Sequence, residues 1–281
     1  MAAGGTPAER PSDTYVLGTD PAERERLRLQ HELWLPAARE AWGRAGLAPG
    51  QRVLDLGAGP GFCALELARA VGPTGKVLAL ELSAAYVQAG QRAAAAAGLE
   101  QLELRRHDLN REALAETGFD LAWCRWLAMF LPAVEPLVET LAGALRPGAQ
   151  VVLHEYIHWD SFGLHPHGPA LGRFGAACQA SFRASGADPD VNRRLPALLA
   201  ARGFRIEELR PLLLLGQPWD PVAAWIERFV AIYGPELVRQ GHWSAAEAEA
   251  AAAEITAAHQ TPGAFWVAPT VMELRATRLD P

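Results

Sequence analysis

The feature that most constrains this chain is a short apolar run that ends on an acid and leads into three closely spaced glycines. Residues 53–62 read Val-Leu-Asp-Leu-Gly-Ala-Gly-Pro-Gly-Phe, and residues 63–70 continue with apolar side chains at helical spacing. The pattern predicts a buried strand, a tight loop and a helix. Glycine tolerates positive φ and lets a ligand approach the backbone, so such a loop in a parallel sheet is typical of nucleotide-binding folds.

The spacing of the glycines excludes two nucleotide motifs. Phe62 stands where the dinucleotide fingerprint requires its third spaced glycine, and no Gly-Lys-Ser/Thr sequence ends the loop as a phosphate-binding loop demands. A loop for a nucleoside without a pyrophosphate remains, beside the alternative of a tight turn that binds no ligand. The acid and the glycines resemble the first motif of the class I S-adenosylmethionine-dependent methyltransferases.

The next two predicted strands also end on acids. Residues 76–82 form an apolar run that closes on Glu81, about 20 residues past the glycines, where doubly wound folds place a carboxylate for the ribose hydroxyls. The alternating residues 102–108 end on Asp108. In the family that this chain resembles, the second acid reads the adenine amino group and the following apolar residue, here Leu109, packs on the ring.

The order of the later segments extends the resemblance. A strand at 119–124 precedes Arg125 in a stretch similar to the family's fourth motif, and a helix at 134–145 stops before a fifth strand at 150–153. The resemblance implies an α/β fold, a Rossmann-like doubly wound seven-stranded sheet with the last strand antiparallel, plus N-terminal lid helices and a helical cap. It implies S-adenosylmethionine as cofactor. The cofactor-binding candidates are Tyr15, Gln30, Asp55, Gly57, Ala58, Gly59, Gly61, Glu81, Leu82, Asp108, Leu109 and Arg125.

Three regions are predicted along the chain. Residues 1–48 hold the lid helices, with a helix over 19–45 in which a break at Pro36 is left open. In the lid, Tyr15 and Gln30 either contact the cofactor or merely anchor the helix. Residues 49–157 form the cofactor-binding core, and residues 158–281 form the cap and the last two strands. The cap helices are expected at 170–184, 190–201, 219–233 and 244–259, and the last two strands within 204–215 and 265–276.

Residues 154–158 read His-Glu-Tyr-Ile-His and match the zinc-protease pattern H-E-x-x-H. That chemistry needs a helix, which places both imidazoles on one face. The preceding Pro-Gly turn and apolar run predict a strand instead, so we expect no metal. The same residues fall at the expected substrate mouth, where a histidine can act as a general base. The catalytic candidates are His154, Glu155, Tyr156 and His158, each with the alternative of a structural role.

Composition narrows the class of partner. The 281 residues carry a net charge of −6, which argues against a nucleic-acid partner. Three scattered cysteines do not form a disulfide framework, and no apolar stretch has the length of a membrane span. We therefore expect a cytoplasmic protein without a membrane partner, and a homodimer is left open.

The predicted function is methyl transfer to an oxygen or nitrogen of a small-molecule acceptor, such as a natural product or a quinone-like metabolite. Alignment of the acceptor with the methyl group carries most of the rate in such a reaction, with a general base as possible help. Aromatic residues in the cap segments hint at an apolar or aromatic acceptor. Two alternatives stay open: a regulatory or partner protein that binds S-adenosylmethionine without methylating, and a nicotinamide-dependent oxidoreductase.

Overall fold

A seven-stranded sheet with strand order β3-β2-β1-β4-β5-β10-β7 forms the centre of the protein. The computed structural model describes residues 21–280. β1 to β5 run parallel to one another, and β10 lies antiparallel between β5 and β7. The expected topology, with an antiparallel last strand, is confirmed. The strands of this sheet are β1 Arg52–Leu56, β2 Lys76–Glu81, β3 Leu102–Arg106, β4 Phe119–Arg125, β5 Leu145–His158, β7 Phe204–Leu212 and β10 Thr270–Arg278.

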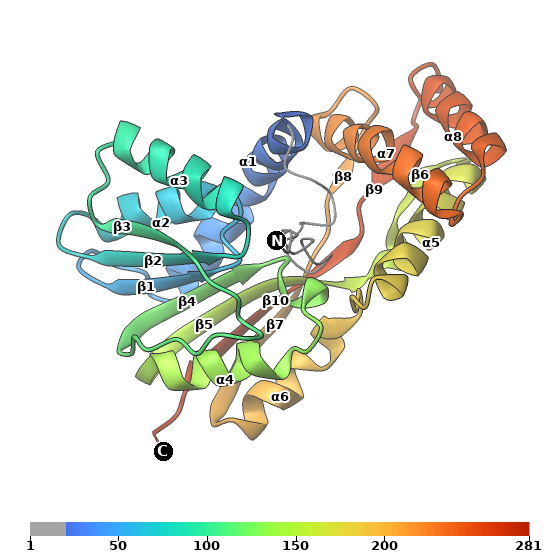
Figure 1. Ribbon diagram of the computed structural model, residues 1–281. Coiled ribbons are helices and arrows are strands. Elements are labelled where there is room, and N and C mark those ends of the chain that lie inside the picture. Colours follow the sequence, from blue (N-terminus) through green and yellow to red (C-terminus); the bar gives the residue numbers. More distant parts are fainter. Residues whose placement is uncertain (1–20, 281) are drawn as a thin grey trace, which may run out of the picture.

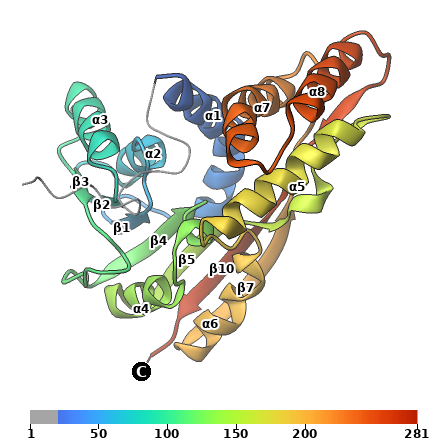
Figure 2. The same ribbon diagram turned by 45° about the vertical axis from the view of Figure 1, so that its right-hand side comes forward.

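Helices cover both faces of the sheet, which explains why the central strands are continuous apolar runs. Val53 of β1 packs in one layer with α1 and α2, whereas its neighbour Leu54 packs in the opposite layer with α4. Figure 1 shows α2 and α3 on one side, and Figure 2 shows α4 and α6 on the other. The helices of these layers are α1 Pro21–Arg44, α2 Phe62–Val71, α3 Ala84–Ala96, α4 Glu135–Ala144 and α6 Leu195–Ala201.

The cap stands beyond the carboxyl ends of the parallel strands (Figure 1). A small antiparallel sheet of order β6-β9-β8 supports its helices. This small sheet was not predicted from the sequence. The cap consists of β6 Gly163–His165, α5 Pro169–Ala184, β8 Leu215–Gly216, α7 Pro221–Gln240, α8 Ala245–Ala258 and β9 Phe265–Val267.

Several predicted boundaries differ from the structure. The first helix continues through Pro36 without a break. The expected strand 204–215 divides into β7 and β8, because its last residues leave the large sheet and pair with β9 instead. The expected helix 190–201 is a 3₁₀ turn, Val191–Arg193, followed by α6. The expected strand within 265–276 is likewise divided, with Pro269 between β9 and β10, as its missing N–H requires.

The last turn of α1 is tied to the sheet by a buried charge cluster. Arg44 pairs with Glu273 of β10, and Glu273 Oε2 lies 3.0 Å from His154 Nε2 of β5. Glu273 and His154 are both fully buried. Burial opposes ionisation of Glu273, but hydrogen bonds from His154 and Arg44 outweigh it and lower the pKa of this carboxyl. The cluster fixes where α1 leaves the sheet and therefore where it crosses the carboxyl edge.

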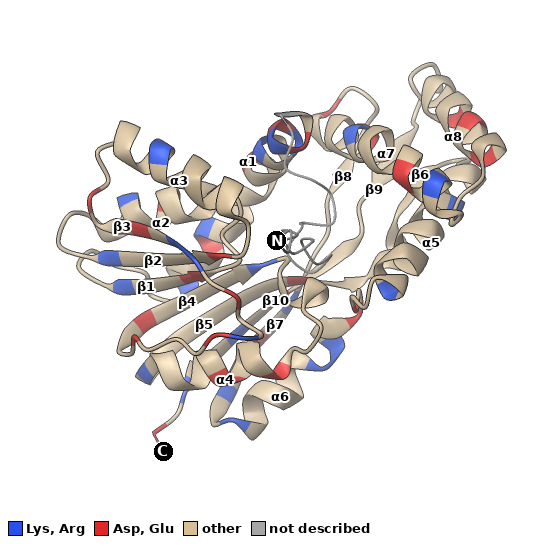
Figure 3. Ribbon diagram, in the orientation of Figure 1, with Lys and Arg blue, Asp and Glu red and all other residues tan. Residues whose placement is uncertain are grey.

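Acidic and basic residues are interspersed over the helices and do not gather by sign (Figure 3). On α1, Arg28 lies within salt-bridge distance of Glu25 and Glu32, one turn away on either side. Such exposed pairs contribute little to stability. Across residues 21–280, no helix combines the length and the apolar character that a membrane span requires.

Candidate functional site

The loop after β1 leaves open space at its centre. Gly57 adopts a φ of 70°, and a Cβ at this position would lie 2.8 Å from the Cβ of Leu127, so a side chain does not fit. Gly59 has a φ of 54°, and a Cβ built there has no atom within 4 Å. The loop is therefore packed tightly where it leaves the strand and open at Gly59, where a ligand can approach the backbone.

Two acids flank this loop at the ends of β2 and β3. Glu81 accepts hydrogen bonds from the backbone N–H of Gly59 at 2.9 Å and from that of Ser83 at 2.8 Å. Burial raises the pKa of Glu81, although these two hydrogen bonds act to lower it. Asp108 accepts from the backbone N–H of Asn110 at 2.9 Å, and Leu109 beside it is buried. Each carboxylate oxygen has two lone pairs, so both acids keep the capacity to accept further bonds.

A partly buried basic group, Arg125, lies on the other side of the loop. Arg125 Nη2 is 3.4 Å from His31 Nδ1, and Arg125 Nη1 is buried without a hydrogen-bond partner among the described residues. Asp55 is 2% exposed, and its Oδ2 likewise has no partner there. Burial raises the pKa of Asp55 to about 7, although the charge of Arg125 opposes the rise. Unpaired buried polar atoms are costly, so this cluster is suited to a polar ligand.

His31 of α1 forms a wall of the same cluster. Its ring stacks on Phe62 with centroids 5.5 Å apart, at the start of α2. Burial, with help from the charge of Arg125, lowers the pKa of His31 to about 4. The imidazole is therefore neutral near neutral pH, and its Nδ1 can accept a hydrogen bond from Arg125. The helix α1 thus closes over the glycine loop.

The turn after β4 is held in an unusual conformation. Trp126 has a φ of 52°, a region that a bulky side chain rarely adopts. Glu155 Oε1 accepts hydrogen bonds from the backbone N–H groups of Leu127 and Ala128, each at 2.8 Å. These bonds, which a fully buried carboxylate accepts, fix the turn. Arg125 lies close enough to Asp55 for its charge to oppose the rise in the pKa of that carboxyl, and Trp126 lines a cavity. The two side chains also contact each other, because the Arg125 guanidinium lies 4.9 Å from the centroid of the Trp126 ring.

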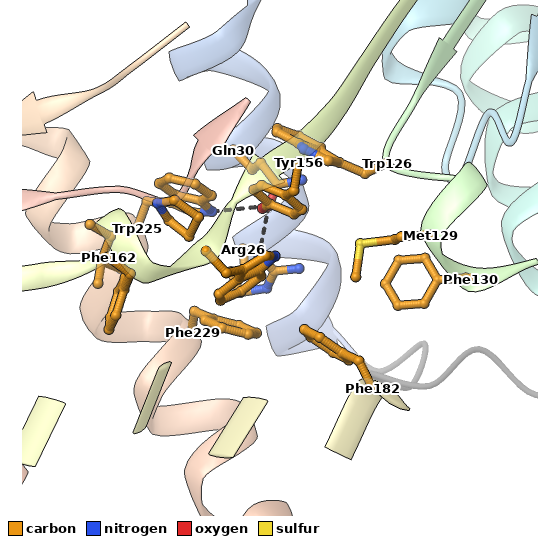
Figure 4. Close-up of a pocket in the computed structure, with 13 residues that line it drawn as sticks. Arg26, Gln30, Trp126, Met129, Phe130, Tyr156, Phe162, Phe182, Trp225 and Phe229 are labelled. Carbon is orange, nitrogen blue, oxygen red and sulfur yellow. Dashed lines mark hydrogen bonds between the residues drawn. The ribbon is translucent and has the colours of Figure 1, made fainter. Parts of the chain in front are cut away.

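That cavity is lined mainly by aromatic side chains. About 560 Å³ of space lies between its side chains, and part of this space is open to solvent. Trp126 stacks on Tyr156 with ring centroids 5.6 Å apart, and Tyr156 contacts Trp159 at 4.9 Å. Figure 4 shows the side chains converging from α1, the turn after β4, the end of β5 and the cap. The lining residues are Arg26, Gln30, Trp126, Met129, Phe130, Tyr156, Trp159, Phe162, Phe182, Trp225, Ile226, Phe229 and Pro269.

Polar groups are few in this wall. Arg26 is the one charged side chain among the described residues that line the cavity. Its Nε and Nη2 each lie 2.7 Å from a carboxylate oxygen of Glu23, which is fully buried, so the charge is neutralised in place. Gln30 Oε1 accepts from Arg26 Nη1 at 2.8 Å and from Trp225 Nε1 at 3.0 Å. The first bond lies within α1, and the second joins α1 to α7 at the cavity wall (Figure 4).

Comparison with known proteins agrees with this geometry. Residues 53–148, which run from β1 into β5, match a family model described as a methyltransferase domain. Over these residues the chain is similar to the class I S-adenosylmethionine-dependent methyltransferases, whose cofactor is S-adenosylmethionine. Phe62 in place of a third spaced glycine, the feature that separates this loop from a dinucleotide site, agrees with such a cofactor.

Curated relatives share the methyltransferase domain at moderate identity. The chain is 31% identical over 145 residues to 2-phytyl-1,4-naphtoquinone methyltransferase of Synechococcus elongatus, covering 51% of this chain and 58% of the relative. It is 29% identical over 173 residues to nocamycin O-methyltransferase of Saccharothrix syringae, covering 62% and 60%. The match thus spans less than two thirds of the length of either relative.

Solved structures share the fold. A geranyl diphosphate methyltransferase, in complex with GPP and sinefungin, aligns with a TM-score of 0.58 at 18% identity, covering 93% of this chain and 84% of the other. The YcgJ protein of Bacillus subtilis aligns with a TM-score of 0.57 at 17% identity, covering 86% and 100%. At these identities the comparison supports the fold of the methyltransferase domain.

The structure brings most of the predicted cofactor residues together. Asp55 lies near the end of β1, and the loop that follows contains Gly57, Ala58, Gly59 and Gly61. Glu81 accepts a hydrogen bond from this loop at Gly59. Leu82, Asp108 and Leu109 follow the neighbouring strand ends, and Arg125 lies on the opposite side of the loop. Gln30 lines the aromatic cavity and contacts Arg26 and Trp225. Tyr15 lies outside the described residues.

The four catalytic candidates are dispersed. The stretch 154–158 is part of β5, so the H-E-x-x-H pattern is on a strand as predicted. His154 is buried against Glu273, and Glu155 faces the turn after β4. His158 is exposed at the strand end, and Tyr156 alone of the four lines the cavity. Among residues 21–280 no group of three potential metal ligands comes together.

Sequence reasoning missed three residues of the site. His31, Trp126 and Arg26 were not among the candidates, although His31 adjoins Gln30 and Trp126 adjoins Arg125. No local sequence pattern predicts the role of Trp126, because its backbone conformation depends on Glu155, which lies 29 residues later in the chain. Arg26 was hidden within a helix that carries many other charges, and its burial depends on packing against Phe229, 5.4 Å away.

We expect Glu155→Gln to change how stability depends on pH. Burial raises the pKa of Glu155 to about 7. Between the ordinary pKa of a glutamate and pH 7, Glu155 is therefore protonated in the folded protein and ionised in the unfolded chain. Stability from this group is therefore lost as pH rises toward 7. Glutamine keeps the acceptor oxygen and does not titrate. Urea unfolding should show the variant gaining roughly 2 kcal/mol relative to the wild type between pH 5 and pH 8.

Glu155→Ala is the matched comparison. It removes the acceptor and leaves the N–H groups of Leu127 and Ala128 without their partner. Unfolding free energy should fall by roughly 2–4 kcal/mol at both pH values. An equal effect of pH on the wild type and Glu155→Gln would contradict the assignment of a raised pKa to Glu155.

Proposed function

We propose that the protein transfers a methyl group from S-adenosylmethionine to an oxygen or nitrogen of an apolar small-molecule acceptor. The observation that carries this proposal is the pairing of two compartments across one turn. The polar glycine loop adjoins Arg125, and Trp126 lines an aromatic cavity. The two compartments meet at these residues, since the Arg125 guanidinium lies 4.9 Å from the centroid of the Trp126 ring. The named relatives, which include a naphthoquinone methyltransferase and a natural-product O-methyltransferase, support the choice of a small-molecule acceptor.

The residues of the loop fit the cofactor. We propose that the nucleoside lies over Gly59 with its ribose hydroxyls on Glu81, and that Asp108 and Leu109 hold the adenine. The open space at Gly59 and the free lone pairs of Glu81 support this placement. The unpaired Arg125 Nη1 suits the carboxylate of the methionine part, because guanidinium pairs well with carboxylates. The Asp55 carboxyl suits the amino group of the same methionine part.

Alignment of the acceptor with the methyl group would supply most of the rate. S-adenosylmethionine supplies a methyl group on a sulfonium, which an acceptor nucleophile attacks in line. The described lining residues include no imidazole and no carboxylate, so an acceptor that ionises readily is favoured and its proton leaves to water. Trp126, Tyr156 and Phe182 would hold an apolar acceptor flat against the turn, and Tyr156 is the catalytic candidate that touches this space.

A methyl-transfer screen tests the proposed function. The full chain is incubated with methyl-labelled S-adenosylmethionine and a panel of phenols, hydroxyquinones, amines and carboxylic acids. We expect label in phenols or hydroxyquinones of two or three rings and none in short carboxylic acids, which lack the apolar surface to fill the cavity. Binding of S-adenosylhomocysteine without any transfer would favour a non-methylating partner protein. Binding of NAD in its place would favour an oxidoreductase and overturn the proposal.

Substitution of Gly59 tests the position of the cofactor. Gly59→Val places a branched side chain in the open space of the loop and should reduce S-adenosylhomocysteine affinity by at least a hundredfold in calorimetry. Gly98 offers a matched control, because its φ of 65° strains a valine in the same way and its Cβ also meets no atom. Gly98→Val should bind normally. Retained affinity in Gly59→Val would show that the loop is not the site.

Substitution of Arg125 tests the position of the methionine carboxylate. Arg125→Gln should weaken binding of S-adenosylhomocysteine by roughly tenfold to a hundredfold, since a charge-assisted pair contributes about 1.5–3 kcal/mol. Binding of 5′-methylthioadenosine, which lacks the amino-acid part, should change less than twofold. Equal losses for both ligands would indicate that Arg125 supports the fold of the loop and does not contact the carboxylate.

A further inference from the structure

The orientation of the Gln30 side-chain amide is determined by its neighbours. Its Oε1 accepts from Arg26 Nη1 and from Trp225 Nε1. Neither donor can accept a hydrogen bond, so the atom that faces them must be the oxygen and cannot be the nitrogen. The NH₂ group therefore points the other way, and the usual ambiguity between the two ends of a glutamine does not arise.

The NH₂ group of Gln30 is a hydrogen-bond donor at the cavity. Within residues 21–280, Nε2 donates to no protein group, and it is absent from the atoms that are both buried and unpaired. Gln30 retains 8% exposure and lines the cavity. Figure 4 shows it among the aromatic side chains, between Trp225 and Arg26. A hydrogen-bond donor of fixed orientation in an apolar wall favours ligands that carry a hydrogen-bond acceptor at the matching position.

The rest of the wall limits the charge and shape of that molecule. The charge of Arg26 is already balanced by Glu23. The cavity therefore offers no unbalanced positive charge to a bound carboxylate or phosphate. The stacked pair of Trp126 and Tyr156, with rings inclined by 24°, offers flat aromatic surface. A neutral planar ring system with a carbonyl oxygen satisfies both the donor and the wall.

We propose that the acceptor is a hydroxylated aromatic ketone or quinone whose carbonyl oxygen is bound by the Gln30 side-chain amide. This inference rests on the proposed function and names the substrate class of its site. A donor on the carbonyl withdraws charge from a conjugated hydroxyl and favours its ionised form. The hydroxyl proton passes to water, the new O–C bond forms as the S–C bond breaks, and S-adenosylhomocysteine leaves. Gln30 thereby compensates for the lack of a base in the described wall.

A matched pair of probes tests this contact. 9-Fluorenone and fluorene share one planar skeleton and differ by the carbonyl. Their affinities are measured by calorimetry on the full chain at pH 8 in the presence of S-adenosylhomocysteine. Gln30→Glu keeps an oxygen for Arg26 and Trp225 but replaces the donor with a second acceptor. The ratio of fluorenone to fluorene affinity should fall roughly tenfold in this variant, the effect of losing about one hydrogen bond.

Two further variants complete the test. Gln30→Met removes all three polar contacts and should lower the same ratio without weakening fluorene, with folding checked by thermal unfolding. Gln260→Glu adds the same charge at an exposed position outside the cavity and should leave the ratio unchanged. A ratio that stays constant in both Gln30 variants would overturn the inference.

Cofactor affinity separates this inference from the proposed function. S-adenosylhomocysteine should bind the Gln30 variants within twofold of the wild type, since Gln30 faces the acceptor space. A large loss of cofactor affinity with no change in the fluorenone ratio would assign Gln30 to the cofactor lid and overturn the inference. Failure of the wild type to bind S-adenosylhomocysteine would overturn the proposed function, whatever the probes show.

Discussion

The hydrogen bonds from Leu127 and Ala128 to the buried carboxylate of Glu155 are the interaction on which the site depends. Trp126 has a positive φ, a conformation that costs of order 1–3 kcal/mol. These hydrogen bonds offset that cost and stabilise the turn after β4. With them, Trp126 lines the aromatic cavity while Arg125, beside the glycine loop, lies 4.9 Å from the centroid of the Trp126 ring. The contact between these two side chains is therefore where the polar and aromatic compartments meet, and Glu155 fixes the turn that carries both.

The two compartments differ in whether their charged side chains are already paired. Around the glycine loop, Arg125 and Asp55 carry buried atoms with no partner among the described residues, so this side gains by receiving a charged ligand. In the cavity, Arg26 is satisfied by Glu23, and the wall is otherwise aromatic or aliphatic apart from Gln30. This contrast follows from local pairing and not from net charge. It gives each side its own selectivity.

The sequence was sufficient to predict the core, because its signals are local. The acid–glycine loop, the strand-end acids Glu81 and Asp108, and the apolar runs of β1 to β5 each lie within a few residues. The cavity was not predictable in this way. Its walls come from α1, α5 and α7, and the Gln30–Trp225 contact joins residues 195 positions apart. The division of 204–215 into two strands likewise depends on β9, which follows much later in the chain.

The helix α1 presents consecutive residues to the two compartments. Gln30 lines the cavity, while His31 stacks on Phe62 beside the glycine loop. Its far end is fixed to the sheet by Arg44 and Glu273. Because Gln30 and His31 belong to one continuous helix, any substitution that shifts α1 would displace a side chain of the cavity and a side chain of the loop cluster together. The shape of the aromatic cavity and the wall of the glycine loop are therefore not independent of each other.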